Sequence, residues 1–517
     1  MSSTAISASA PQRKIHPGLV AISVMLATIM QALDTTIANV ALPHMQGSLA
    51  ATQDQISWVL TSYIVAAAIT MPATGFIAAK IGRKRLLLLS ISGFIVTSML
   101  CGIALSLDQI VIYRLLQGIF GASLVPLSQA VLLDAYPREK HGAAMAMWGV
   151  GVMVGPILGP TLGGYLTENF DWRWVFFINL PFGLLALAGV LAFVSETNRR
   201  AALRFDAMGF MFLGIAIGAL QMMLDRGELL DWFGSTEIVA EAVIAALAFY
   251  LFVVHMFTYR EPFLEPELFK DRNFVVGTSF MFAVGVILLA TMTLLPPMLQ
   301  QLAGFPVLTT GYVLAPRGIG TMMSMFVVGR LVGKVDPRIL ILTGLVLAAF
   351  SLWEMTNFNI DVGIWDIVRT GLVQGAGLGL IFVPLSTITF STLPSGLRTE
   401  AAGLFSLMRN IGSSVGISIV TALLVQNTQV NHSTLAEHIT PYMGALQTPG
   451  YPSMWSLGTT GGLAMLNAEI TRQAQMIAYL DDFKLLMWVT IAAAPLILLL
   501  RKNRRAIPKE AMETVVE

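Results

Sequence analysis

The chain of 517 residues is 56% hydrophobic and 12% charged, with a net charge of +1. Soluble domains carry about 25% charged residues, so this composition excludes an ordinary soluble domain. The small net charge gives no indication of nucleic-acid binding. The single cysteine, Cys101, excludes an intramolecular disulfide and a thiolate metal site.

Apolar runs of about twenty residues recur along the chain, each long enough to cross a bilayer. A lipid-exposed backbone must satisfy its own hydrogen bonds, and the alternating ten-residue segments of a barrel are absent. We therefore predict an all-α polytopic membrane protein. Its fourteen expected spans lie near 18–40, 56–79, 86–106, 110–133, 143–164, 175–195, 207–225, 237–258, 274–298, 310–333, 339–357, 364–388, 401–424 and 483–500. The first run is too long for a cleaved signal peptide.

Lysine and arginine indicate the orientation of these spans. With the N-terminus inside, the inner loops and tails hold 22 of the 31 basic residues, and the outer loops hold three, Arg173, Arg226 and Arg472. Such a bias predicts that both termini lie in the cytoplasm. It also requires an even number of spans, which fourteen satisfies.

A weak internal repeat suggests two related halves. Residues 125–128 read Val-Pro-Leu-Ser and recur at 383–386, and the Arg114, Gln117-Gly118 group is echoed by Arg369, Gln374-Gly375, about 255 residues later. Duplicated halves are a common transporter plan. The predicted divisions are a cytoplasmic tail 1–17, a six-helix half 18–205, two inserted helices 206–258, a cytoplasmic linker 259–273, a second six-helix half 274–500, and a cytoplasmic tail 501–517.

The second half contains a long outer segment, residues 425–482, before the last expected span. Its first part is polar and contains three prolines, and its apolar spacing becomes helical from Leu463 to Leu480. Long loops in compact proteins are usually functional or disordered. An ordered cap or docking element and a disordered loop are both compatible with this pattern.

Asp34 and Arg114 are charged residues inside predicted spans 1 and 4. A carboxylate in mid-membrane costs roughly 2.5–3.5 kcal/mol on insertion scales. Burial favours its protonated form and a nearby cation favours its ionised form, so such a group can load and release a proton. A guanidinium keeps its proton, and Arg114 is therefore a tuning charge. The alternative is a structural ion pair that locks two helices together.

Glycines and prolines are concentrated in span 5. They are Gly151, Gly155, Pro156, Gly159, Pro160, Gly163 and Gly164. Glycines at this spacing give a smooth face that another helix can approach closely, and prolines bend a helix. The pattern predicts a tight, kinked contact between the two halves, or a generic packing face for small residues.

Further polar residues in the spans are candidates for a substrate cavity. They are Gln31, Asn39, Gln117, Arg317, Gln374, Arg409 and Asn410. Arg369 and Glu354 lie nearer span ends, where solvation needs no function. The 28 methionines are typical of an adaptable pocket or of simple apolar filling. No phosphate-binding G-x-x-x-x-G-K-[ST] loop and no clustered catalytic group or metal ligands occur, which argues against ATP use, an enzyme, a cofactor or a metal.

These motifs together resemble the major facilitator superfamily, specifically its fourteen-helix drug:proton antiporters of the EmrB/QacA type. The similarity covers about Leu19 to Arg501. It is carried by residues 33–43 around Asp34, by Arg114 to Gly118, by Gly151 to Gly164, which matches the antiporter motif, and by residues 171–181. The resemblance implies proton coupling through Asp34 and Arg114, driven by the proton-motive force.

The resemblance also carries one departure and one implication about partners. The family usually has an acid between spans 2 and 3, where this chain has Ala79, so the cytoplasmic latch that this acid forms is in doubt. Relatives of this type work in tripartite pumps of the bacterial inner membrane. The resemblance therefore implies an EmrA-like periplasmic adaptor, with 425–482 as its contact, and a TolC-like outer-membrane channel.

The predicted function is proton-coupled export of hydrophobic small molecules by alternating access, from a protein surrounded by membrane lipid. One alternative is export of a dedicated metabolite or lipid-like molecule, and second-half arginines would favour an anionic cargo. A membrane receptor or scaffold without transport is a third possibility, which the Asp34–Arg114 pair and the span-5 motif oppose. An importer is disfavoured by the same motif.

Overall fold

The computed structural model describes residues 16–137, 140–197, 204–439 and 459–501. Within these ranges the chain is helical and has no strand. Thirteen helices or helix pairs are long and apolar enough to cross a membrane. Helix α13, Val307–Leu331, is the fourteenth long helix and covers the predicted span 310–333. The predicted all-α polytopic architecture is confirmed.

The first six spans form the first half. They are α1 (Pro17–Ser48), α2 with α3 (Gln53–Thr70 and Thr74–Ile81, joined by a 3-10 turn Met71–Ala73), α4 (Arg83–Gly102), α5 with α6 (Leu107–Gly121 and Leu124–Ala135), α7 (His141–Asn169), and α8 with α9 (Trp174–Phe177 and Asn179–Phe193). Helix α1 packs against α7, α9, α6 and α2 and so lies at the centre of this half.

Two further helices, α10 (Ala207–Arg226) and α11 (Thr236–Thr258), pack against each other between the halves in sequence. Helix α10 contacts α2 of the first half and α16 of the second. Polar bonds fix both contacts: Thr61 donates to Asp225, and the Gln221 amide lies 2.8 Å from the Ser414 hydroxyl. The inserted pair therefore connects the two halves from one side.

The second half comprises α12 (Arg272–Pro297) with a π-helical turn (Met298–Leu302), α13, α14 (Pro337–Met355), α15 (Ile364–Ser391), α16 (Arg398–Glu437), and α17 with α18 (Thr460–Ala493 and Leu496–Leu499). The shorter 3-10 turns are Trp232–Gly234, Pro266–Lys270 and Ser395–Leu397. Aspartate side chains begin α10, α12 and α14 by accepting a bond from a first-turn amide, at Asp206, Asp271 and Asp336.

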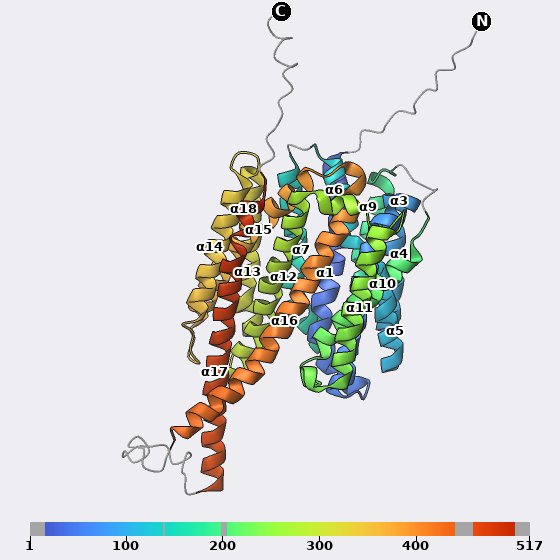
Figure 1. Ribbon diagram of the computed structural model, residues 1–517. Coiled ribbons are helices and arrows are strands. Elements are labelled where there is room, and N and C mark those ends of the chain that lie inside the picture. The colour runs from blue at the N-terminus through green and yellow to red at the C-terminus, as the bar shows by residue number, and fades with distance from the viewer. Residues whose placement is uncertain (1–15, 138–139, 198–203, 440–458, 502–517) are drawn as a thin grey trace, which may run out of the picture.

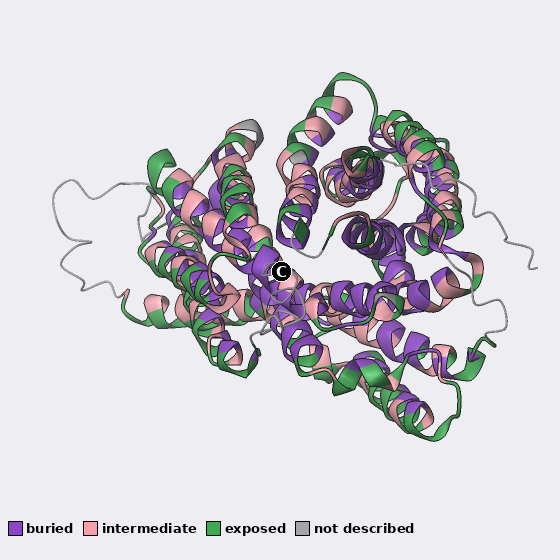
Figure 2. Ribbon diagram, turned by 90° about the horizontal axis from the view of Figure 1, so that it is seen from above, coloured by how far each residue is buried: buried purple, intermediate pink, exposed green. Residues whose placement is uncertain are grey.

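The halves meet along α7 with α13 and along α6 and α3 with α16. Viewed along the bundle, buried residues line the helix faces that point inward, while exposed faces point outward (Figure 2). Large apolar side chains such as Leu247, Phe257 and Met323 are exposed on these outer faces. An exposed apolar surface of this extent suits contact with lipid.

Helices α16 and α17 project beyond the rest of the bundle at the end opposite α3 and α18 (Figure 1). The projecting parts of both helices belong to the predicted outer segment 425–482. The two ends of this segment are therefore extensions of the helices that form spans 13 and 14. The His432 ring nitrogen lies 3.0 Å from the Asn467 side-chain oxygen and ties the two extensions together. Residues 440–458 of this segment lie outside the described residues.

Candidate functional site

A polar centre is buried among α1, α2, α5 and α9 of the first half. Arg114 Nη1 lies 2.6 Å from Asp34 Oδ2, and each residue is only 1% exposed. The structure thus brings together the two residues that the sequence singled out, in direct contact. A pair so fully buried is retained only where hydrogen bonds satisfy its remaining polar atoms.

Neighbouring amides complete the hydrogen bonding of the Asp34 carboxylate. Gln117 Nε2 donates to Oδ1 at 2.9 Å, and Asn179 Nδ2 donates to the same oxygen at 2.7 Å. Gln117 also accepts a bond from Arg114 Nη1 at 2.9 Å. Three donors therefore stabilise the ionised carboxylate in this conformation.

Arg114 is held from two further directions. Its Nε donates to the Val59 carbonyl at 3.0 Å, and its guanidinium carbon lies 4.3 Å from the ring centroid of Tyr63. A guanidinium over an aromatic face gains a cation–π attraction. Gln31 donates to the Tyr63 hydroxyl at 3.3 Å, which places that predicted cavity residue at the edge of the same centre.

Sequence reasoning missed Asn179 and Ser98 as members of this centre. Asn179 is 1% exposed and also donates to the Ser98 hydroxyl at 2.9 Å. A lone amide inside the apolar run Phe176 to Leu180 is the signal that would have found Asn179, since polar residues in spans usually bond across helices. Asn39, in contrast, is exposed and bonds only to its own helix, through the Thr35 carbonyl.

The glycine-rich face of α7 packs against α1. A side chain at Gly155 would collide with the backbone of Ala32, and one at Gly163 would come within 3.3 Å of the Ile37 carbonyl oxygen. Because the two helices lie so close together, the Thr36 hydroxyl donates to the Gly155 carbonyl at 3.1 Å. The predicted glycine contact between halves is therefore wrong: the contact lies within the first half, on the helix that carries Asp34.

The helical repeat of α7 decides which of the other motif residues face α1. Gly151 faces Met25 and Gly159 faces Thr36, both on α1, while a Cβ added at Gly164 would meet no atom within 4 Å. The helix runs continuously from His141 to Asn169 through Pro156 and Pro160. The face that does meet the second half contacts α13, as where Ile157 approaches Gly318.

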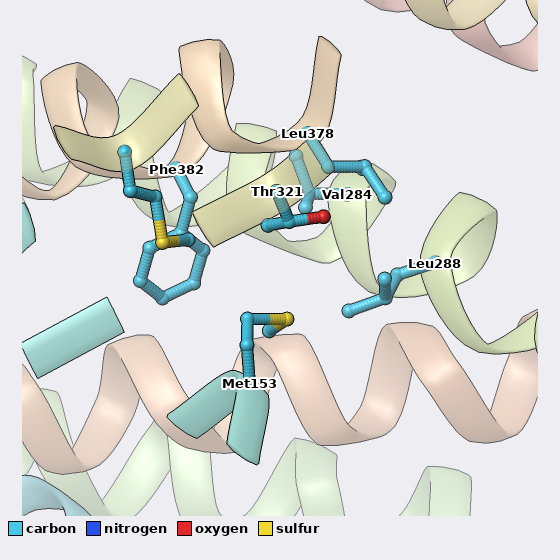
Figure 3. A pocket seen from close by; sticks show the side chains of 7 residues that line it. Met153, Val284, Leu288, Thr321, Leu378 and Phe382 are labelled. Atoms are coloured by element: carbon cyan, nitrogen blue, oxygen red, sulfur yellow. The ribbon is translucent and has the colours of Figure 1, made fainter. Parts of the chain in front are cut away.

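A small pocket lies between the halves, lined by α7, α12, α13 and α15 (Figure 3). Its lining side chains are Met153, Val284, Leu288, Thr321, Met325, Leu378 and Phe382. Two methionines and one hydroxyl make a predominantly apolar, deformable wall. The volume is about 10 Å³, room for a single water molecule, whereas drug-sized ligands need about 300–1,000 Å³. This pocket is therefore too small in this conformation to hold a drug-sized ligand.

Arg317 does not line this pocket but contacts Leu288, which does. It lies one turn before Thr321 on α13, is 5% exposed, and donates through Nη2 to the Leu288 carbonyl at 3.2 Å. No carboxylate pairs with it in the described part of the chain. Gln374 is fully buried and donates to the Thr291 hydroxyl at 3.4 Å. Arg409 and Asn410 are half-buried on α16 and form no ion pair among the described residues.

A separate group of ion pairs joins the two halves at the end of the bundle predicted to face the cytoplasm. Asp134, at the end of α6, pairs with Arg83 of the first half and, at 3.1 Å, with Arg398 of the second. Close by, the Glu265 amide donates to the Glu400 carboxylate at 2.6 Å. Ala79 has no carboxylate to pair with a cation of the other half, and in this structure Asp134 forms such an ion pair.

Comparison with known proteins agrees with this geometry. The Major Facilitator Superfamily profile matches residues 24–417. The fatty acid resistance protein FarB of Neisseria gonorrhoeae is 38% identical, over 90% of this chain and 92% of the relative. The multidrug export protein EmrB of Escherichia coli K12 is 36% identical, over 90% and 91%.

Among solved structures, the human organic anion transporter MFSD10 (TETRAN) matches with a TM-score of 0.60 and 15% identity. The match covers 93% of this chain and all of that one, and it supports the fold. The profile match and the close relatives decide the family. The chain is a multi-pass membrane protein that belongs to the major facilitator superfamily, among its EmrB-type efflux transporters.

Proposed function

We propose that this transporter exports hydrophobic drugs and toxic compounds in exchange for protons, by alternating access. The observation that carries the proposal is the buried Asp34–Arg114 pair, with its amide donors Gln117 and Asn179. Because the donors lie on α5 and α9 and the carboxylate on α1, a shift of these helices that lengthens the contact with Arg114 would allow Asp34 to be protonated. Each proton that enters down about 100 mV supplies roughly 2.3 kcal/mol.

The test is efflux of a hydrophobic dye from proteoliposomes under an imposed proton gradient. We expect the wild type to expel dye only with the gradient, and Asp34→Asn to bind dye without responding to the gradient. Equal gradient-driven efflux by the variant would show that Asp34 is structural. Absence of efflux from the wild type, with dye binding intact, would favour a receptor or scaffold.

A second candidate is export of a dedicated lipid-like or other amphipathic acid. Two observations favour it: Arg317, which pairs with no carboxylate among the described residues and bonds to the pocket residue Leu288, and the relative whose name records fatty acid resistance. The same liposomes distinguish the candidates when loaded with a long-chain fatty acid anion or with a cationic dye. Export of the anion alone would replace the multidrug proposal.

We also propose that the protein lies in the bacterial inner membrane, with both termini in the cytoplasm, and works in a tripartite pump. The extended α16 and α17 would contact an EmrA-like periplasmic adaptor that leads to a TolC-like channel. Cysteines placed at the exposed Val430 and Leu463 should cross-link to the adaptor, while one at the exposed Leu105 should not. Cross-linking from Leu105 alone would contradict this docking site.

A further inference from the structure

Asp482 on α17 is a buried acid that the proposed mechanism does not use. The residue is 1% exposed, and neither carboxylate oxygen has a hydrogen-bond partner among the described residues. Its neighbour Asp481 is exposed. Two adjacent acids of the same helix therefore lie in opposite surroundings.

The surroundings of Asp482 are apolar. Tyr479, Phe483 and Leu486, which share its region of α17, are buried in a cluster built from α12, α14, α15 and α16 as well as α17. The cluster includes Leu294, Met355 and Val420 from three of these helices. The tyrosine is the nearest polar side chain along the buried face of α17, one turn away.

No cation pairs with Asp482 in the part of the chain that the structure describes. On α16, Arg409 forms no ion pair with any described acid. On α17 itself, Lys484 is exposed.

The remaining titratable groups of the neighbouring helices are occupied or distant. Glu354 of α14 pairs with Arg369 at 3.1 Å. Arg272 and Arg338 donate to the carbonyls of Leu499 and Leu500, about 25 Å from Asp482 at 1.5 Å per residue. The others lie near the ends of α16: Arg398, Glu400, His432, Glu437 and His438.

An ionised carboxylate in such a place lacks both a cation and a donor. Leaving a buried charge without compensation costs several kcal/mol, and the neutral acid avoids this cost. We infer that Asp482 is a second proton-binding site, which holds a proton in this conformation and is separate from the Asp34 centre. Asp34 has three donors, and Asp482 has none among the described residues.

A polar pocket lies near this part of the bundle. A pocket of about 250 Å³ lies where α14 ends and α15 begins, and it is lined by Glu354, Asp361, Asp366 and Arg369 among others. This volume holds several water molecules, and three acids against one arginine attract protons. Phe358 lines the pocket and packs edge-on against Phe483, at 6.4 Å between ring centroids. The residue next to Asp482 therefore contacts a residue that lines the pocket.

Infrared difference spectroscopy of the purified full-length protein at neutral pH tests the assignment. The carbonyl stretch of a protonated acid is separate from the bands of a carboxylate. Asp482→Asn should lose intensity from the protonated band, and the matched control Asp481→Asn should lose it from the carboxylate bands. Asp482→Leu should lose the same protonated band. This variant introduces no amide, so it excludes the asparagine side chain as the source of the change.

Loss of carboxylate intensity in both Asp482 variants would overturn the proposal. Participation of this proton in export rests on the proposed function, but its presence does not. If the wild type failed to export dye, the infrared result would still decide whether Asp482 holds a proton. If export were confirmed, unchanged proton-to-dye stoichiometry in Asp482→Asn would assign the second proton a role outside the exchange.

Discussion

The centres of the two halves differ at equivalent positions. Counting 257 residues on from Asp34, Arg114 and Gln117 gives Thr291, Gly371 and Gln374 in the second half. Arg369, the echo of Arg114 in the sequence repeat, lies two residues before Gly371 and pairs with Glu354 instead. The glutamine pairing is kept: Gln117 donates to Asp34, and Gln374 donates to Thr291. At these positions the second half has a hydroxyl in place of the carboxylate and a glycine in place of the arginine.

The space left by the missing arginine is occupied from another helix. A side chain on Gly371 would lie 3.5 Å from the Cβ of Arg317, which enters from α13. Each half thus has a buried arginine near its glutamine, but among the described residues only the arginine of the first half pairs with an acid. The difference agrees with a division of the proposed tasks, with proton exchange in the first half and recognition of cargo charge in the second.

Removing the cation of the first half should have the largest effect. Arg114→Met leaves the Asp34 carboxylate buried without its partner, and breaking such a pair costs about 3–5 kcal/mol. We expect a lower unfolding midpoint in detergent and no gradient-driven efflux. The double variant Asp34→Asn with Arg114→Met should recover part of the stability. If the double variant were as unstable as the sum of the single ones, the two residues would not be coupled.

The two glutamines offer a matched pair of substitutions. Gln117→Leu removes a donor from Asp34 and an acceptor from Arg114, which should cost about 1–3 kcal/mol. Gln374→Leu removes one long bond from a residue whose side-chain oxygen already lacks a partner, and should cost less than about 1 kcal/mol. Denaturant titration of both variants measures the difference. Equal losses would mean that the two centres are energetically alike.

Arg317 should affect affinity for cargo with little effect on folding. Arg317→Gln should raise the KM for an anionic substrate about tenfold, equivalent to about 1.4 kcal/mol, and leave a cationic dye unaffected. Arg317→Lys should retain part of the affinity because it keeps the charge. Arg369→Gln is the control, since Arg369 is half exposed and already paired with Glu354. A parallel loss for both cargo types would assign Arg317 a packing role.

The smallest effect on transport is expected at Thr291, the second-half counterpart of Asp34. Thr291→Val keeps the shape of the side chain and removes a hydroxyl that bonds the Ile287 carbonyl within its own helix at 2.7 Å. The cost should be about 0.5–1.5 kcal/mol, and proton coupling should be unchanged. A change in the number of protons exchanged per substrate, measured in liposomes, would contradict the division between the halves.

Much of this architecture follows from the sequence because the bilayer imposes a simple length rule on apolar runs. The Asp34–Arg114 contact was predictable since two charges inside spans need each other. The sequence could not predict which helix packs against the glycines of α7, because a face of small residues fits any neighbouring helix equally well. Asn179 was overlooked because one amide barely changes the hydropathy of its span.

Asp482 illustrates the same limit. The sequence Asp481-Asp482-Phe483-Lys484 looks solvated, and it led to an expected start of the last span at residue 483. The structure buries one acid and exposes the other, since helical rotation of about 100° between neighbours decides their surroundings. Composition over a window cannot separate adjacent residues in this way, whereas packing of α17 against its neighbours does.

Proton release on substrate binding tests the central claim most directly. Purified protein in weakly buffered detergent is mixed with a saturating hydrophobic substrate, and the released protons are recorded with an indicator dye. We predict release by the wild type and by Thr291→Val, and none by Asp34→Asn. Release of the same number of protons by Asp34→Asn would contradict the claim that the first-half centre exchanges the coupled proton.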